Sequence, residues 1–367
     1  MGQRLIFRAF PYETFLPNQN ELTKLTSKIT SKSCDIDPVP ASVLKNCFQI
    51  LLPIVTKIVN LSLSSAVVPT SLKIAVLTPL LKKPSLDHEE YLNFRPISNL
   101  KFVSKAIEKT VATQVNAYIN ENNMNEVLQS AYKEKHSTET ALLKVHDDVL
   151  RALDRQQSVL LLLLDLSSAF DTVDHNILLD RLSRRFGITG TALNWFSSYL
   201  SERKQFVAVN GGTSSHRDLP CGLPQGSILG PMLFLMYTAP LSDIIRQHDM
   251  NFHLYADDTQ VYISFESSST ELARASIEAC VSDIDKWMSQ NLLKMNRNSF
   301  ITDNPMIMKQ STDNLRRDKF SSQTTTSETF SSKTIVRRNN LITFNLRRDK
   351  FALITDNHIR ESALIKY

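Results

Sequence analysis

Two adjacent carboxylates, Asp257 and Asp258, lie between two short apolar segments and constrain the fold more than any other feature. Residues 251–255 and 260–265 are rich in aromatic and β-branched side chains, which predicts two strands joined by a tight turn. Adjacent carboxylates repel each other and lose hydration where a hairpin tip packs against a core. Both stay ionised only if a cation neutralises them, so the pattern predicts a cation-binding hairpin.

A third carboxylate, Asp165, follows the apolar run 159–164, which reads as another strand. If this strand lies beside the hairpin, Asp165, Asp257 and Asp258 converge at one end of a sheet. Carboxylate oxygens in that number are the ligand set that a pair of Mg²⁺ ions requires. Taken alone, Asp165 precedes two serines and is better explained as a cap or turn residue.

Composition limits the class of protein without deciding it. The chain has 367 residues and a net charge of +5, which permits a nucleic-acid partner but does not require one. Four scattered cysteines argue against a zinc knuckle or a disulfide scaffold and fit a reducing compartment. We find no signal-peptide pattern and no apolar run near the ~20 residues of a membrane span. We therefore expect an intracellular protein, nuclear or cytoplasmic, that does not insert into a membrane.

Hydrophobic periodicity predicts an α+β fold with a largely antiparallel sheet backed by helices. A strong hairpin signal, Asn-Gly-Gly, occurs at 210–212. Ser137 and Asp174 are predicted to begin helices as N-terminal caps. Helices are predicted at 41–63, 101–120, 137–156, 174–185, 191–200, 223–246 and 270–291, and strands at 74–81 (broken at Pro79), 159–165, 205–210, 213–219, 251–255 and 260–265.

The character of the chain changes after Asn296, where Ser, Thr and Asn dominate and periodicity fades. Asn-Leu-Arg-Arg-Asp-Lys-Phe occurs at 314–320 and again at 345–351, but two copies are too few for a solenoid. The arginine pairs could bind phosphates, although a solvated tail is the favoured interpretation. We expect a polar extension at 1–34, the main domain at 35–296 and a low-complexity, disordered tail at 297–367.

Several motifs in a fixed order resemble reverse transcriptases of non-LTR (LINE-type) retrotransposons. The resemblance covers roughly residues 35–296, and five or six motifs in the family's order are far more specific than an isolated Ala-Asp-Asp. The motifs are Phe-Arg-Pro-Ile-Ser at 94–98, Gln-Ser-Ala-Tyr-Lys at 129–133, Asp-Leu-Ser-Ser-Ala-Phe-Asp at 165–171, Leu-Pro-Gln-Gly-Ser at 223–227, Tyr-Ala-Asp-Asp at 255–258 and Asn-Leu-Leu-Lys at 291–294.

The resemblance implies an RNA-directed DNA polymerase, a nucleotidyltransferase that adds deoxynucleotides to a primer 3′-hydroxyl. It implies an RNA template, a DNA primer, deoxynucleoside triphosphates and two Mg²⁺ ions, with Mn²⁺ as a possible substitute. It also implies the polymerase right-hand fold. Because the tail replaces what usually follows Asn-Leu-Leu-Lys, we expect fingers plus palm with the thumb missing or degenerate, and hence weakened hold on the duplex.

Carried over residue by residue, the resemblance assigns the metal ligands to Asp165, Leu166, Asp257 and Asp258. Asp165 and Asp257 would bridge both ions, and Asp258 would support them. Phe170 stands where the family has a steric gate against a 2′-hydroxyl, with ordinary core packing as the alternative.

The remaining candidates would contact the nucleotide or the template. In 223–226, Gly226 would let the backbone pass close to the nucleotide, and Gln225 would offer amide contacts; the stretch is also a helix N-terminal turn. Lys133 replaces an arginine that meets the triphosphate in the family. Lys82 and Lys294 are further candidate cations with exposed surface lysines as the alternative, and Arg95 would contact the template or brace the fingers.

Two other functions compete with this one. A non-catalytic nucleic-acid-binding remnant of a retroelement would keep the fold without turnover; the intact carboxylates argue against it and the missing thumb argues for it. A viral RNA-dependent RNA polymerase is disfavoured by Leu-Pro-Gln-Gly at 223–226 and by Phe170.

Overall fold

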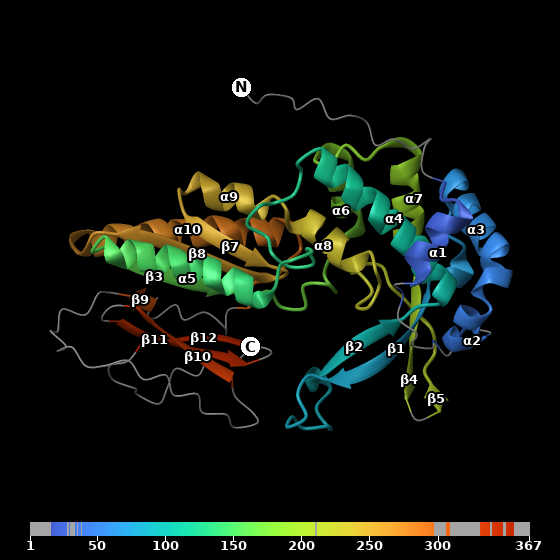
Figure 1. Ribbon diagram of the computed structural model, residues 1–367, viewed down its shortest axis with the longest axis horizontal. Helices are drawn as coiled ribbons and strands as arrows, with labels where there is room; N and C mark the ends of the chain where they lie inside the picture. Colours follow the sequence, from blue (N-terminus) through green and yellow to red (C-terminus); the bar gives the residue numbers. More distant parts are fainter. Residues whose placement is uncertain are drawn as a thin grey trace.

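The computed structural model describes residues 16–27, 29, 34, 36–37, 39–209, 211–296, 306–308, 331–337, 340–347 and 350–355. Its helices and mixed sheets form an α+β fold. Figure 1 shows two of its sheets at different positions along the long axis. The one that carries the acidic residues is called the acidic sheet.

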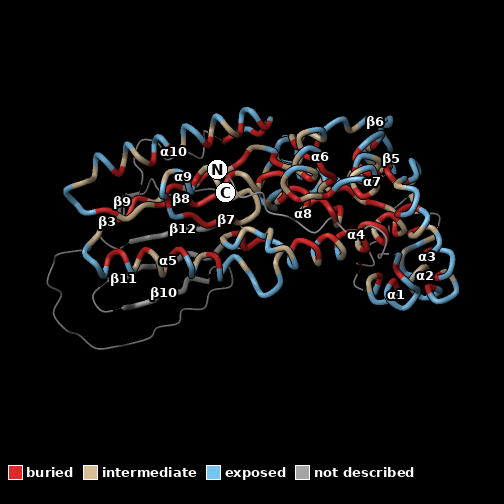
Figure 2. The backbone as a smooth tube through the Cα atoms, turned by 90° about the horizontal axis from the view of Figure 1, so that it is seen from above, coloured by how far each residue is buried: buried red, intermediate tan, exposed pale blue. Residues whose placement is uncertain are grey.

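The acidic sheet has the strand order β7-β8-β3-β9 and is antiparallel at each junction (β3 Ser158–Leu164, β7 Asn251–Tyr255, β8 Asp258–Phe265, β9 Met306–Met308). Helix α10 (Thr270–Gln290) contacts β8, while α5 (Thr138–Asp154) contacts β3 and β7. Figure 2 shows the sheet between these two helices. Since both faces of β3 are covered, its leucine run needs no polar alternation, and five of its seven residues are buried.

The second sheet has the order β2-β1-β4-β5, with β6 also paired to β4. Strand β1 is antiparallel to β2 and parallel to β4. The predicted break at Pro79 is wrong, because β1 continues through this residue. Pro79 pairs with Pro96 of β2, and the pairing of β1 with β4 already ends at Leu77. On the β4 side, no partner strand therefore needs the N–H that proline lacks. The bounds are β1 Ile74–Leu81, β2 Phe94–Asn99, β4 Lys204–Val209, β5 Gly212–Thr213 and β6 Arg217–Asp218.

Two long helices of the prediction are each divided in two. The predicted helix 41–63 consists of α2 (Ala41–Asn46) and α3 (Phe48–Ser65), and no proline or glycine marks the break at Cys47. The predicted helix 223–246 begins later, as α8 (Gly230–Thr238), and resumes as α9 (Leu241–Gln247) after Pro240, which has no N–H to continue the ladder. The other helices are α1 Gln19–Ser27, α4 Phe102–Glu121, α6 His175–Arg184 and α7 Gly190–Leu200.

Both predicted helix caps are confirmed. The Ser137 side chain accepts a hydrogen bond from the Thr140 N–H, and the Thr140 hydroxyl accepts one from the Ser137 N–H, so a reciprocal capping box begins α5. Asp174 accepts a hydrogen bond from the N–H of Ile177 and caps α6.

One continuous hydrophobic cluster runs from Leu22 of α1 to Met295. It includes residues of the acidic sheet and of most of the helices. Leu22 is fully buried, so α1 shares this core. The predicted domain boundaries stay predictions. Within the predicted tail, β9 pairs with β3, and β10 (Ser331–Arg337), β11 (Asn340–Arg347) and β12 (Lys350–Thr355) form an antiparallel sheet; the rest of the tail and residues 1–15 lie outside the described residues.

Helix α3 is the one described helix that is long and apolar enough to cross a membrane, with 18 residues and a mean hydropathy of 1.4. Core helices meet the same criterion. Leu52, Val55 and Val59 on α3 are buried in the main core, whereas Ile50 and Ile54 are exposed.

Candidate active site

The three acidic residues predicted from the sequence lie at the same end of the β7-β8-β3 sheet. Leu164 pairs with Thr259, so Asp165 and Asp258, which adjoin this pair, lie at the same end of the two antiparallel strands. Tyr255 pairs with Asp258, which leaves Ala256 and Asp257 as the two residues of the hairpin turn. Ala256 adopts a left-handed conformation with φ of 57°.

The electrostatics of this acidic end show that the three carboxyl groups interact. Burial, together with the negative charges of Asp257 and Asp165, raises the pKa of Asp258 to about 7. Burial also raises the pKa of Asp257; Asp165 adds to the shift, while a backbone hydrogen bond and Arg95 oppose it. Ionisation of all three carboxyl groups is therefore unfavourable, and a bound cation would stabilise their ionised forms.

The side chains do not form a preassembled coordination sphere. Among the residues that the structure describes, no group of three or more His, Cys, Asp or Glu side chains is gathered closely enough to hold a metal ion. What the fold supplies is the convergence of three carboxylates at one end of the sheet, with the donor chemistry that divalent cations prefer.

The segment after α10 holds the Asp165 loop in place. The Asn296 amide donates to a carboxylate oxygen of Asp165 (Nδ2 to Oδ2, 2.9 Å), and the Asn296 N–H donates to the Asp165 carbonyl (2.9 Å). Leu166 forms a bridge with Met295, and the Ser167 N–H donates to the Lys294 carbonyl (2.9 Å). Leu166 and the main chain of Lys294 thus adjoin the Asp165 loop, while the Lys294 side chain is exposed and its contact with a nucleotide stays a prediction.

Gly226 is needed where the 223–226 loop meets strand β2. Its φ is +116°, and a Cβ there would lie 2.7 Å from the Ser98 carbonyl oxygen. The Ser98 N–H donates to the Gln225 carbonyl (2.6 Å), and the Gln225 amide donates to Asp171 (Nε2 to Oδ1, 3.1 Å). The close approach we expected toward a nucleotide is thus made to the protein itself; contacts of Gln225 and Gly226 with a nucleotide stay a prediction.

Phe170 packs into the protein on one side. Its ring stacks on that of Phe234, with centroids 4.6 Å apart and planes at 19°. The Phe170 carbonyl accepts from the Leu223 N–H (2.8 Å), which links this residue to the 223–226 loop. The core-packing alternative is therefore correct for at least part of the ring, and the gate stays a prediction.

The three cations predicted for the nucleotide and template differ in their surroundings. Arg95, exposed on β2, is the one that acts on the acidic end, since it lowers the pKa of Asp257. The Lys133 ammonium donates to the Glu126 carbonyl, and burial lowers the pKa of Lys133. The Lys82 ammonium donates to the Leu92 carbonyl (2.8 Å). Because an ammonium has three N–H donors, each lysine can contact a phosphate without leaving its carbonyl.

Sequence reasoning missed a buried acid, Glu108 of α4, which supports the start of α8. Glu108 is 1% exposed and accepts hydrogen bonds from the N–H groups of Ile228 (2.6 Å) and Leu229 (3.4 Å) and from the Tyr199 hydroxyl (3.2 Å). Burial raises its pKa, and nearby Arg203 opposes the shift. A charged residue on the apolar face of a predicted helix was the signal that could have identified it.

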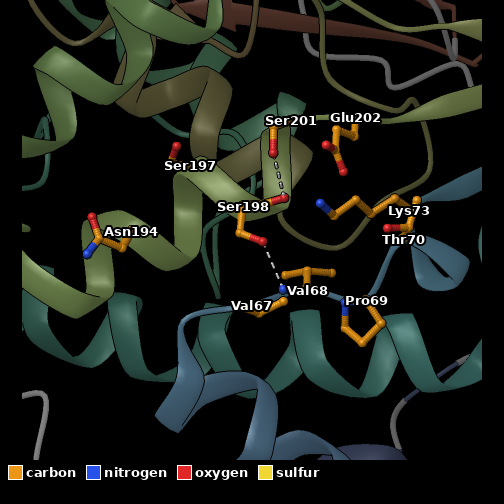
Figure 3. Close-up of a pocket in the computed structure, with 10 residues that line it drawn as sticks. All are labelled: Val67, Val68, Pro69, Thr70, Lys73, Asn194, Ser197, Ser198, Ser201 and Glu202. Carbon is orange, nitrogen blue, oxygen red and sulfur yellow. Dashed lines mark hydrogen bonds between the residues drawn. The ribbon is translucent and has the colours of Figure 1, made fainter.

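A polar pocket of about 410 Å³ lies away from these residues, between the 67–73 segment and the C-terminal end of α7. Figure 3 shows the ammonium of Lys73 directed into it, with the carboxylate of Glu202 nearby. None of the predicted site residues lines this pocket. The acidic end of the sheet, rather than this pocket, is the candidate active site.

Comparison with known proteins identifies the family. Residues 81–298, more than half of the chain, match the reverse transcriptase (RNA-dependent DNA polymerase) family. Curated relatives from Drosophila melanogaster include the probable RNA-directed DNA polymerase from transposon BS (27% identical, covering 72% of this chain and 29% of the relative) and that from transposon X-element (26%, covering 60% and 24%). The RNA-directed DNA polymerase from mobile element jockey is 26% identical, covering 56% of this chain and 22% of the relative.

The chain thus spans less than a third of the length of these relatives. Enzymes of the matched family generally use divalent metal ions. The motif order, the family match and the transposon relatives agree: the chain belongs to the reverse transcriptase family, in its non-LTR (LINE-type) group.

Proposed function

We propose that this chain is an RNA-directed DNA polymerase module of a non-LTR retrotransposon, which extends a primer 3′-hydroxyl with deoxynucleotides on an RNA template. The observation that carries the proposal is the convergence of Asp165, Asp257 and Asp258, whose charges act on one another at the end of one sheet. In the right-hand description, this sheet is the palm, and β1 and β2 belong to the fingers.

The donor set fits divalent cations, because carboxylates that raise one another's pKa are relieved by positive charge. Asp165, Asp257 and Leu166 would hold two Mg²⁺ ions, with Asp258 in support; Mn²⁺ would substitute. When bound, the ions neutralise the attacking and leaving oxygens of an in-line phosphoryl transfer.

The other predicted residues would orient the substrates. Arg95 would contact the template or brace the fingers from β2. Phe170, backed by Phe234, would press against the sugar and disfavour a 2′-hydroxyl. Lys133, Lys82 and Lys294 would meet phosphate oxygens, and Gln225 and Gly226 would shape the floor beneath the nucleotide.

The test is a primer-extension assay on poly(rA)·oligo(dT) with Mg²⁺. Asp257→Asn should reduce extension at least 100-fold, because a neutral amide supplies less charge to the cations. Asp249→Asn is the matched control: Asp249 is exposed just before β7 and has a φ of 53°, which asparagine also tolerates.

The outcomes separate the two functions. Mg²⁺-dependent extension that Asp257→Asn abolishes and Asp249→Asn preserves supports a polymerase. Template binding without any Mg²⁺-dependent extension would instead support the non-catalytic nucleic-acid-binding remnant. Incorporation of ribonucleotides as readily as deoxynucleotides would contradict the assignment of Phe170.

A further inference from the structure

We propose that Gln129 is a positioning residue for Asp257, acting through the backbone of Ala256; this rests on the proposed polymerase function. Gln129 lies outside the sheet and far away in sequence from the hairpin. Among the described residues, the hydrogen bonds of its side chain go to main-chain N–H groups and not to the three carboxylates. Its influence therefore passes through the turn that carries Asp257.

The segment around Gln129 lines the free edge of β7. The Leu254 N–H donates to the Leu128 carbonyl (2.8 Å), and the Ser130 N–H donates to the Leu254 carbonyl (3.0 Å). Gln129 and Leu254 form a parallel bridge. Since β7 is the outer strand of its sheet, this short segment covers its edge and holds position 129 beside the hairpin turn.

The Gln129 side chain then reaches the turn itself. It is 5% exposed, and its Oε1 accepts two hydrogen bonds, from the N–H of Ala131 (2.8 Å) and from the N–H of Ala256 (3.1 Å). Two N–H donors at one atom fix that atom as the amide oxygen, because the NH₂ group can only donate.

Ala256 is where the hairpin most needs such support. Its φ of 57° places a residue with a Cβ in the left-handed region, a backbone conformation that such residues rarely adopt. The peptide that joins Ala256 to Asp257 sets the direction in which the Asp257 carboxylate leaves the turn. An acceptor fixed on the Ala256 N–H therefore stabilises the turn conformation that directs Asp257 toward Asp165.

A second contact ties the same two segments together. The Ser130 hydroxyl lies 2.9 Å from Nε2 of His253, and both residues are buried. Burial lowers the pKa of His253 to about 4, with the charge of Lys144 adding to the shift, so the ring is neutral at the pH of the assay. This neutral hydrogen bond holds the edge segment in register without placing another charge near the carboxylates.

The experiment replaces the acceptor while keeping the volume. Gln129→Met removes the amide oxygen, and Gln129→Glu keeps an acceptor oxygen in nearly the same shape. The matched control is Gln260→Met on β8: Gln260 is 6% exposed, and its Oε1 has no hydrogen-bond partner among the described residues. Each variant is examined for Mn²⁺ affinity by electron paramagnetic resonance, for amide exchange in the 253–258 segment and for primer extension.

We expect Gln129→Met to weaken Mn²⁺ binding at least fivefold, to speed exchange of the Ala256 amide at least tenfold and to lower kcat at least tenfold with little change in the nucleotide KM. Gln129→Glu should keep amide protection within threefold of the starting chain, and Gln260→Met should keep both amide protection and Mn²⁺ affinity within threefold. Unchanged Mn²⁺ affinity and unchanged Ala256 protection in Gln129→Met would overturn the proposal.

Two further results remain interpretable. If Gln129→Met does not fold, Gln129→Asn provides the test, because its shorter side chain cannot reach both N–H groups, and the same losses are expected. If the starting chain binds Mn²⁺ but extends no primer, the polymerase proposal fails, whereas exchange and Mn²⁺ binding still decide whether Gln129 positions the hairpin.

Discussion

At the scale of single residues, Gly226 joins two segments that are far apart in the sequence. The loop 223–226 and strand β2 approach so closely that a Cβ at position 226 would lie 2.7 Å from the Ser98 carbonyl oxygen. Because this oxygen belongs to the main chain, it cannot rotate away as a side chain could. Glycine is therefore required both by the space available and by its φ of +116°.

Gly226→Ala should lower the free energy of unfolding by about 2 kcal/mol or more, because the methyl group forces β2 and the loop apart. Gly212→Ala is the control, since the nearest atom to its Cβ would be the Val209 carbonyl oxygen at 3.5 Å, an ordinary contact. Urea unfolding of both variants measures the difference. Equal midpoints for the two alanine variants would show that the approach to Ser98 is not needed.

Asp258 gives the folded chain a pH dependence that can be derived from its surroundings. Its pKa in the fold is about 7, against an ordinary value of 3.8, so the folded state holds a proton that the unfolded state releases. The resulting stability is fully present below about pH 4 and is lost as the pH rises through 7. The rise from 3.8 to about 7 corresponds to at most about 4 kcal/mol.

With a chelator present, the free energy of unfolding should therefore fall from pH 5 to pH 8 by more in the starting chain than in Asp258→Asn, whose side chain is neutral throughout. Urea titrations at each pH measure this difference. Adding Mg²⁺ at pH 8 should restore more of the loss in the chain that keeps Asp258 than in Asp258→Asn. Parallel pH profiles for the two proteins would contradict the raised pKa.

At the scale of elements, the acidic hairpin could be predicted because its two strands and its turn are encoded locally. The leucine run before Asp165 could likewise be predicted as a strand, whereas its covering on both faces is seen only in the structure. The contacts that support the hairpin and the Asp165 loop could not be predicted, because Gln129 and Asn296 lie in irregular segments where a lone amide carries no periodic signal. Pro79 was misjudged because its tolerance depends on where β4 stops pairing, which is a tertiary fact.

Glu108 connects two helices that are far apart in the sequence, because it joins α4 to the N-terminal end of α8. Its carboxylate is deeply buried, and Tyr199 of α7 and two backbone N–H groups donate to it. Arg203, 1% exposed, has two guanidinium nitrogens without a hydrogen-bond partner in the described part of the chain, so the negative charge of Glu108 also compensates a buried cation.

Glu108→Ala should lower the free energy of unfolding by about 3–5 kcal/mol, because it leaves the N–H groups of α8 and the Arg203 cation without compensation. Glu121→Ala, at the exposed C-terminal end of the same helix, should change it by less than about 0.5 kcal/mol. Thermal unfolding followed by circular dichroism measures both. If Glu108→Ala melts at the temperature of Glu121→Ala, the buried network does not stabilise the fold.

At the scale of the whole molecule, the continuous core connects α1 to the acidic sheet. Residues from α1, α3, α4, α6–α10 and strands β3, β7 and β8 belong to one packed cluster. Two tryptophans report on different parts of it: Trp195 of α7 is buried and donates to Ser62 of α3, whereas Trp287 of α10 lies under the Arg181 guanidinium. A continuous core predicts that both report the same unfolding transition.

Leu22→Ala tests this continuity from the far end of the cluster. Removing a fully buried leucine of α1 should cost about 2–5 kcal/mol, and the loss should appear equally at Trp195 and at Trp287 when each is followed alone in a Trp287→Phe or Trp195→Phe background. Leu16→Ala, at a site 52% exposed, should leave both transitions in place. If Leu22→Ala shifts the transition at Trp195 but not at Trp287, α1 stabilises a unit that unfolds independently of the acidic sheet, and the core is not cooperative across the molecule.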